Sequence, residues 1–412
     1  MAAEKTPQLP TRSQHHAIFN SSYLDDIPSA LSQWGSQKVL LVFSKSMDNN
    51  TSIIKDLSQR LGSKVVAKKS GVGSHSPYPD VIDIARLIHE HNVDCLICIG
   101  SSSYSDACKI ACLLHSTLSP GFNEEDMESL VDQNKGVSLR ENIAPRKIRL
   151  ILVPTSLSAS EWNDISSCTN FERKKQHFGP DREGGGAADL ILLDPKVAAT
   201  SPEKLWLSSG FRAVDHCVET ICNRHLPEHR DKDEILAWAK EGLQTLLLGL
   251  RDYRDGKTKH DEDELMRGID SCQKGARLAM MGLVIHHISM GPSHAIGHQI
   301  GSVAGVMHGV TSCIMLAPVL RYQKKKGISV NAQNTVLEIF NSTLNWHEKE
   351  AADAVQRFVE YLKLPNKLSD VGVGKDVEGD KMVDKIAEKS MTDILADFES
   401  KDEILEILGM AR

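Results

Sequence analysis

The stretch Ile99-Gly-Ser-Ser-Ser-Tyr-Ser-Asp-Ala-Cys-Lys109 decides the fold class. The apolar run Asp94 to Ile99 is typical of a buried strand, and Asp106 to His115 is typical of a helix. A turn of small residues between them lets a helix N-terminus and its free N–H groups approach a phosphate. A serine-capped helix with no ligand is the alternative. The residues expected to bind a dinucleotide cofactor here are Gly100, Ser101, Ser102, Ser103, Asp106 and Lys109.

The same alternation of strand and helix continues on both sides of this stretch. Strands are predicted at 39–43, 64–67, 149–153 and 189–194, and helices at 52–61 and 79–90. Short apolar strands separated by amphipathic helices predict an α/β domain with a mainly parallel, doubly wound sheet. A second small-residue turn, Gly71 to Ser76, lacks the GxGxxG spacing and adds little.

The pattern changes after Ser201-Pro202. Long helical periodicities follow at 233–253, 262–289 and 350–362, with hardly any strand-like segment. The sequence therefore predicts a disordered leader at 1–15, an α/β cofactor-binding domain at 16–195 and an all-helical catalytic domain at 196–412.

Composition narrows the class of protein. The chain has 412 residues and a net charge of −7, with only short basic stretches, which argues against a nucleic-acid partner. An odd number of cysteines, nine, suits a reducing compartment. No apolar run reaches the ~20 residues of a membrane span, and the first residues lack a signal-peptide core. We expect a cytoplasmic protein without a membrane partner.

Histidines gather in the second half of the chain. His294 and His298 are four residues apart and share a helix face, and His308 follows after Gly301 and Gly305. Arg212 and His216 have the same four-residue spacing. Two helices with such polar faces suit a metal or proton transfer, whereas a single histidine on an apolar face is usually a hydrogen-bonded core residue.

At these residues the sequence resembles the iron-containing alcohol dehydrogenase family. The matching motifs, in order, are Gly100-Ser-Ser-Ser103 with Asp106 and Lys109, Pro154-Thr-Ser-Leu-Ser-Ala-Ser-Glu161, Leu193-Asp194-Pro195, Ser209 to Glu219 and Gly291 to Gly309. The resemblance implies the dehydroquinate synthase-like fold of that family, an NADH or NADPH cofactor, a small-molecule substrate and a homodimer. It also places Thr155, Ser156 and Ser158 near the nicotinamide.

One departure from the family changes the expected chemistry. Metal-using members hold the ion with an aspartate and three histidines, and the matching positions are Arg212, His216, His294 and His308. A guanidinium cannot ligate a cation. The sequence is therefore similar to the metal-free branch typified by maleylacetate reductase, an enzyme of aromatic catabolism. This predicts a metal-independent reductase in which Arg212 anchors a carboxylated substrate and His298 or His308 delivers a proton.

Two alternatives stay open. A metal-dependent alcohol dehydrogenase or aldehyde reductase would use His216, His294 and His308 as a three-histidine site. A non-redox enzyme or binding protein on the same scaffold is suggested by Ser101 and Ser102, because each places a side chain where glycine is expected against the pyrophosphate.

Overall fold

A computed structural model describes residues 2–180, 185–393 and 395–412. The chain divides into two compact units, Met1–Ser201 and Pro202–Arg412. The division falls shortly after residue 195, where the sequence placed the boundary. Each unit is described by itself.

The first unit is built on a seven-stranded sheet in the order β1-β2-β11-β8-β5-β3-β4. All neighbouring strands are parallel except β1, which pairs antiparallel with β2. The predicted parallel α/β sheet is confirmed. The strands are β1 Glu4–Pro7, β2 His16–Phe19, β3 Val39–Phe43, β4 Val65–Ser70, β5 Cys95–Gly100, β8 Arg149–Pro154 and β11 Leu190–Leu193.

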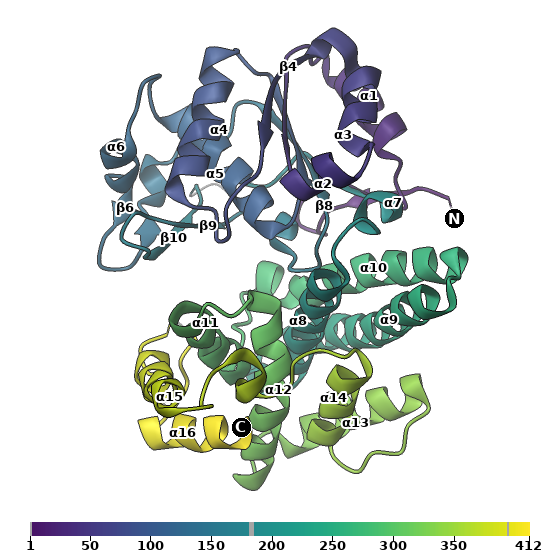
Figure 1. Cartoon of the computed structure of the whole chain (residues 1–412), viewed down its shortest axis with the longest axis vertical. Helices are drawn as coiled ribbons and strands as arrows, with labels where there is room; N and C mark the ends of the chain where they lie inside the picture. The colour runs from purple at the N-terminus through teal and green to yellow at the C-terminus, as the bar shows by residue number, and fades with distance from the viewer. Residues whose placement is uncertain (1, 181–184, 394) are drawn as a thin grey trace. The chain divides into compact units, whose positions relative to one another are not determined.

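Helices cover both faces of this sheet (Figure 1). In β3, Val39, Leu41 and Phe43 pack in one apolar cluster with residues of α1 and α3, while Leu40 and Val42 are also fully buried. Burial on both faces explains why β3 reads as a continuous apolar run. The helices of this unit are α1 Tyr23–Trp34, α2 Lys45–Asn50, α3 Ile53–Leu61, α4 Tyr78–Glu90, α5 Ser102–Thr117, α6 Glu124–Glu128 and α7 Pro195–Ala198.

The structure differs from the sequence prediction at the N-terminus. Where a disordered leader was expected at 1–15, Glu4–Pro7 forms β1 and Leu9 is fully buried. Arg12 donates to the Trp162 carbonyl at 2.8 Å and pairs with Asp164 at 2.9 Å. Long-range contacts thus order a polar segment whose own sequence carries no periodic signal.

A second, small sheet was also missed. Its order is β6-β7-β10-β9, with β6 Val131–Asp132, β7 Val137–Ser138, β9 Ser166–Thr169 and β10 Lys175–Phe178. Strands of two to four residues are too short for a period of two to be recognised.

Among its described residues the second unit has helices joined by loops and no strand, as predicted. Its helices are α8 Glu203–Ile221, α9 Lys232–Lys259, α10 Glu262–His286, α11 Pro292–Ala304, α12 His308–Lys325, α13 Val330–Leu344, α14 Ala351–Tyr361, α15 Val377–Ser390 and α16 Lys401–Met410. No helix in the described part of the chain has both the length and the apolar character of a membrane span.

Helices α9 and α10 form a long antiparallel hairpin with backbones in close contact (Figure 1). A Cβ at Gly249 would lie 2.8 Å from the Cys272 amide, and one at Gly256 would lie 2.6 Å from the Leu265 amide. Glycine is needed at these positions because a side chain would push the helices apart. This register places the start of α9 beside the end of α10.

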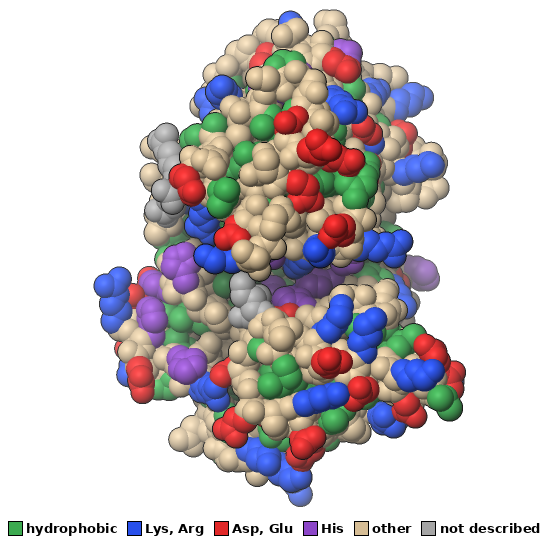
Figure 2. All heavy atoms as spheres, turned by 90° about the vertical axis from the view of Figure 1, so that its left-hand side faces the viewer, with side chains coloured by type: hydrophobic (Ala, Val, Ile, Leu, Met, Phe, Trp, Pro, Cys, Tyr) green, Lys and Arg blue, Asp and Glu red, His purple; other side chains and the backbone are tan. Residues whose placement is uncertain are grey.

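The surface carries both signs of charge. On the face shown in Figure 2, acidic and basic side chains are interspersed over each unit. Mixed charges of this kind are typical of an ordinary solvated surface.

Candidate active site

The predicted phosphate turn joins β5 to α5. Strand β5 ends at Gly100, and Ser101, in an extended conformation, precedes the first helical residue, Ser102. The Ser101 side chain makes no capping hydrogen bond. A Cβ at Gly100 would lie 2.5 Å from Cγ of Tyr104, so the turn requires glycine there. The first N–H groups of α5 therefore lack a side-chain cap, as a helix terminus that receives an anion requires.

This turn lies where the sheet order changes direction. From β3 the chain passes outward to β4 and then returns to β5 on the other side of β3. In open α/β sheets, ligands bind at the carboxyl ends of strands at such a switch point. The Gly71 amide donates to the Phe43 carbonyl at 2.9 Å, so the loop after β4 begins at this edge.

The second small-residue turn, Gly71 to Ser76, contacts the first. The His75 amide donates to Oγ of Ser103 at 3.1 Å, and Oγ of Ser76 donates to the Ser103 carbonyl at 2.8 Å. This turn was weak evidence in the sequence because it lacks the GxGxxG spacing. Its position next to Ser103 makes it part of the candidate cofactor site.

Lys109 forms its hydrogen bonds and its ion pair inside the first unit. Its fully buried Nζ donates to the carbonyls of Ser160 at 2.6 Å and Asn163 at 2.9 Å, and it pairs with Asp106 at 3.4 Å. Burial raises the pKa of Asp106, although the Lys109 charge opposes the shift. Lys109 therefore ties α5 to the segment that follows β8. Its expected role in binding the dinucleotide cofactor stays a prediction.

The segment after β8 lies against the Gly100 turn. The Thr155 amide donates to the Gly100 carbonyl at 3.0 Å. Ser156 is buried, and its Oγ has no hydrogen-bond partner among the described residues, while Ser158 is half-buried. Glu161, at the end of this segment, was not among the predicted site residues. In the structure, burial raises its pKa to about 7. The predicted nicotinamide segment and the phosphate turn are thus adjacent.

Helix α8 carries the polar residues of the second unit. Arg212, Asp215, His216 and Glu219 follow the i, i+3, i+4, i+7 spacing that places side chains on one helix face. All four are buried. With His294 and His298 of α11 and His308 at the start of α12, they form what we call the histidine centre.

The predicted histidines meet as two stacked pairs. The rings of His216 and His294 are 4.6 Å apart between centroids, and those of His298 and His308 are 5.6 Å apart. Nδ1 of His298 lies 3.2 Å from a carboxylate oxygen of Asp393, which also accepts from Gln299 at 2.7 Å. Asp393 could not be found from the sequence, because it stands 95 residues after His298.

Glu219 holds the start of α11. Its carboxylate accepts from the amides of Gly291 at 2.7 Å and Ser293 at 2.6 Å, and from Nδ1 of His294 at 2.7 Å. Asp215 accepts from Oγ of Ser293 at 2.8 Å. Burial raises the pKa of Glu219 and lowers that of His294, so burial disfavours the charged form of each side chain. The spacing of Asp215 and Glu219 from Arg212 was the available signal, but the sequence prediction did not include either residue in the site.

Arg212 is 3% exposed and forms hydrogen bonds to neutral oxygens in the described structure. Nη1 donates to Oγ of Ser312 at 3.2 Å and to the His308 carbonyl at 3.4 Å. Burial lowers its pKa to about 10, against the opposing charges of Asp215 and Glu219. The guanidinium is therefore positively charged at neutral pH, and Nη2 and Nε form no hydrogen bond to a described residue.

The residues of the histidine centre do not fit the four-ligand metal pattern. Nδ1 of His216 and Nε2 of His294 are buried without hydrogen-bond partners among the described residues, as metal-binding nitrogens would be. Arg212, however, brings a positive charge to the position where the resemblance leads us to expect the fourth ligand. Burial and that charge lower the pKa of His216 to about 3. Added positive charge is therefore unfavourable at this position.

Comparison with known families and proteins identifies relatives over nearly the whole chain. The family model for iron-containing alcohol dehydrogenase matches residues 14–195, and the C-terminal model of the Fe-containing alcohol dehydrogenase family matches residues 209–411. "Dehydrogenase ALT3" of Alternaria alternata is 29% identical over 412 residues, covering 92% of this chain and 100% of that protein. A maleylacetate reductase of Pseudomonas sp. (strain P51) is 28% identical over 174 residues, which are 42% of this chain and 44% of the relative.

The fold also matches solved structures. The crystal structure of maleylacetate reductase from Agrobacterium tumefaciens superposes with a TM-score of 0.72 at 18% sequence identity. The match covers 100% of this chain and 97% of the other. The two-unit architecture therefore agrees with that of a known fold.

Proposed function

The chain belongs to the iron-containing alcohol dehydrogenase family and is an NAD(P)-dependent oxidoreductase, and we propose that it reduces a small, carboxylated, electron-poor carbonyl or enoate compound without a bound metal. The observation that carries the proposal is that Arg212 is buried, charged and hydrogen-bonded to neutral oxygens. The motif resemblance of Ser209 to Glu219 places it where the family is expected to carry a metal-binding aspartate. A maleylacetate-like substrate has the required carboxylate.

The role proposed for Arg212 follows from the chemistry of its side chain. A guanidinium binds a carboxylate through two parallel hydrogen bonds and stabilises negative charge that develops on an enolate. Burial makes this interaction stronger than it would be in water. Arg212 thereby supplies the fixed positive charge that a metal supplies in other members.

The other site residues have supporting roles. NADH or NADPH supplies the hydride when bound at Gly100, Ser101, Ser102 and Ser103 and the adjoining Thr155 to Ser158 segment. His298 or His308 delivers the proton, and His216 and His294 stay neutral because burial lowers the pKa of each. Asp393 orients His298 through its hydrogen bond to Nδ1.

Three further features belong to the proposal. Resemblance to maleylacetate reductases supports a role in aromatic catabolism. The nine free, buried cysteines support a reducing compartment, the cytoplasm. A homodimer is proposed by analogy with the family.

The decisive experiment follows oxidation of NADH and NADPH with maleylacetate, related keto acids and uncharged aldehydes, with and without added metal. Wild-type protein should reduce the carboxylated substrates without metal. Arg212→Gln should lower kcat/KM for them by about 10²-fold, the usual effect of removing one electrostatic contact to developing charge. Arg212→Lys should restore part of the loss, because it returns the charge but not the paired donors.

The matched control is Arg357→Gln, which removes an arginine that is half exposed and stacks on Trp346. Its kinetics should equal those of wild type. A value of kcat/KM for Arg212→Gln within a few-fold of wild type would refute the role of Arg212.

A metal-dependent alcohol dehydrogenase or aldehyde reductase is the second candidate function. The buried nitrogens Nδ1 of His216 and Nε2 of His294, which lack hydrogen-bond partners in the described structure, favour it, with His308 as third ligand. Elemental analysis of protein purified without chelators distinguishes the two. Stoichiometric iron or zinc that is lost in His216→Ala would favour this candidate.

A further inference from the structure

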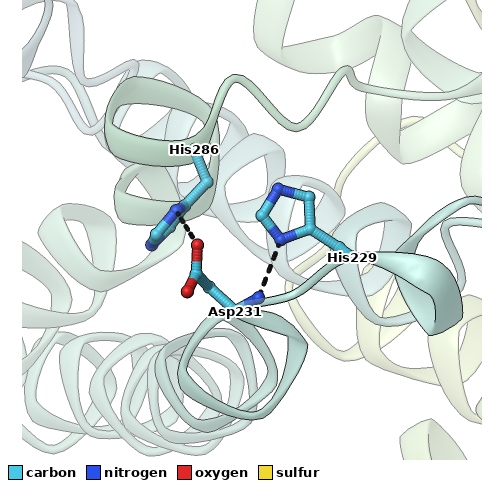
Figure 3. Close-up of side chains that lie close together, drawn as sticks. All are labelled: His229, Asp231 and His286. Carbon is cyan, nitrogen blue, oxygen red and sulfur yellow. Dashed lines mark hydrogen bonds and ion pairs between the residues drawn. The ribbon is translucent and has the colours of Figure 1, made fainter.

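A second group of imidazoles lies at the open end of the α9–α10 hairpin, outside the histidine centre. His229 follows the short 3-10 helix Leu226–Glu228, Asp231 directly precedes α9, and His286 is the last residue of α10 (Figure 3). One ligand atom from each lies within 4.8 Å of the other two. We propose that these three side chains form a binding site for a divalent transition-metal ion of the Zn²⁺ type.

Asp231 does not cap the helix that it precedes. Asp194, Asp261 and Asp376 occupy the same position before α7, α10 and α15, and each accepts a hydrogen bond from its own helix. Asp231 makes no such bond, and its Oδ2 lies 3.4 Å from Nδ1 of His286. The carboxylate is thus directed to the imidazole of the neighbouring helix.

His286 is fixed in an orientation suited to a metal ligand. Its Nε2 lies 3.2 Å from a carboxylate oxygen of Glu234, and its ring stacks on Trp238 with centroids 5.6 Å apart. When Nε2–H donates to Glu234, the lone pair of Nδ1 faces Asp231. Two lone pairs at this distance repel each other unless a metal cation lies between them or the imidazole carries a second proton. Histidine ligands of metals commonly donate their other N–H to a carboxylate in this way.

His229 completes the set of ligands. Its ring lies edge-on to that of His286, with centroids 5.6 Å apart. Its Nδ1 accepts from the Asp231 amide at 3.1 Å, and Figure 3 shows both contacts of Asp231. Two imidazoles and one carboxylate are a typical zinc ligand set with room for water as the fourth ligand. Because an ion bound at Nδ1 would displace the existing hydrogen bond of His229, we expect reversible binding and the smallest contribution from this residue.

Arg230 opposes the ion. Its Nε donates to the same Asp231 oxygen at 3.0 Å, and its side chain is 90% exposed. The guanidinium therefore competes with a cation for the carboxylate but can move into solvent. A bound ion would link the start of α9 to the end of α10, which meet through the register of the hairpin.

The test uses the full-length protein after removal of metals with a chelator. Cu²⁺ serves as the first probe, because it binds imidazole sites more tightly than Zn²⁺ does and quenches the fluorescence of a nearby tryptophan. One equivalent of Cu²⁺ should quench Trp238, an excess of Zn²⁺ should reverse the quenching, and the same excess of Mg²⁺ should not. The signal should be absent in Trp238→Phe, which assigns it to this site and not to the histidine centre.

Variants then separate ligand, orienting and competing residues. His286→Ala and Asp231→Asn should each weaken Zn²⁺ competition at least tenfold, and His229→Ala should weaken it less. Glu234→Gln should weaken it by about 10- to 100-fold, the usual effect of removing a carboxylate that orients a ligand. Arg230→Gln should strengthen it. His260→Ala, which removes an exposed histidine at the other end of the same hairpin, should change nothing.

Thermal unfolding gives a second readout that is independent of fluorescence. Zn²⁺ should raise the Tm of wild type and of His260→Ala with increasing concentration, because it binds the folded state. It should not do so for Asp231→Asn. Absence of quenching in wild type, equal Zn²⁺ competition in wild type and His286→Ala, or equal displacement by Mg²⁺ would each overturn the proposal.

Discussion

The phosphate turn of the first unit and the histidine centre of the second hold their polar groups by different means. At the turn, the functional groups are backbone N–H groups at the start of α5, and a glycine makes room for Tyr104. In the histidine centre they are side chains, and buried carboxylates of α8 fix α11 in place.

The difference determines how each region responds to change. A site made of backbone groups depends on local conformation and tolerates the loss of a side chain. A site held by buried charged groups depends on every partner, because a buried donor or acceptor without a partner is costly. The following predictions test this contrast, beginning with the largest effect.

Glu219→Ala should have the largest effect on stability. It leaves the amides of Gly291 and Ser293 and Nδ1 of His294 without their acceptor. Loss of partners for buried donors should lower the free energy of unfolding by about 2–5 kcal/mol. Calorimetry of the second unit's transition measures this.

The matched change in the first unit is Ser103→Ala, which removes the acceptor of one amide, that of His75, in an exposed hydrogen bond. We expect a loss of about 1 kcal/mol or less. Equal losses in Glu219→Ala and Ser103→Ala would contradict the contrast between the two regions.

Gly100→Ala should weaken cofactor binding with a smaller loss of stability. The added Cβ would lie 2.5 Å from Cγ of Tyr104, so the turn must shift and its N–H groups leave their positions. We expect Kd for NADH or NADPH to rise about tenfold, equivalent to about 1.4 kcal/mol. Fluorescence titration measures Kd. Gly409→Ala in α16, where a Cβ would meet no atom within 4 Å, is the control and should bind normally.

The smallest expected effects are opposite pH dependences in the two units. Burial raises the pKa of Glu161 from 4.5 to about 7, so its folded form binds more protons and this contribution to stability falls as pH rises between those values. Burial, reinforced by Arg212, lowers the pKa of His216 from 6.5 to about 3, so its contribution falls as pH drops between those values.

Hydrogen exchange resolved by unit, compared at pH 7.5 and pH 5.5, measures both contributions. In wild type, the Glu161 contribution makes the first unit more stable at pH 5.5 than at pH 7.5. Glu161→Gln should make this difference in stability smaller. His216→Gln should reduce the acid sensitivity of the second unit, where Asp215, with its pKa raised to about 6 by burial, acts in the opposite direction. Identical pH responses in wild type and both variants would show that neither group carries the effect.

Much of the fold was predictable because its signals are local. The runs at Val39–Phe43 and Cys95–Gly100 are apolar on both faces, so their sequence alone indicates buried parallel strands. The two- to four-residue strands of the small sheet and the ordered N-terminal segment were missed, because distant partners, such as Trp162 and Asp164 for Arg12, stabilise them.

Residues of the candidate site could be selected from the sequence, but the partners of their side chains could not. Helical spacing and family resemblance selected Arg212, His216, His294, His298 and His308, and the structure brings these histidines together in two pairs. The spacing could not say which groups hold them. Asp393, which follows α15, forms a hydrogen bond with His298 of α11. Lys109 donates to backbone carbonyls inside the first unit. Side-chain partners of this kind depend on packing between segments that are remote in sequence.

The sequence by itself determined the α/β and helical halves and the glycine–serine turn, and it placed Arg212 where the family resemblance leads us to expect a metal-binding aspartate. These depend on residue type and short-range periodicity, which the chain carries locally. Only the tertiary structure decided that Glu219 and Asp215 enclose His294, that Lys109 is internal, and that His229, Asp231 and His286 converge. Such contacts form only when separate helices pack, and the close glycine-lined approach of α9 and α10 is what brings the last three together.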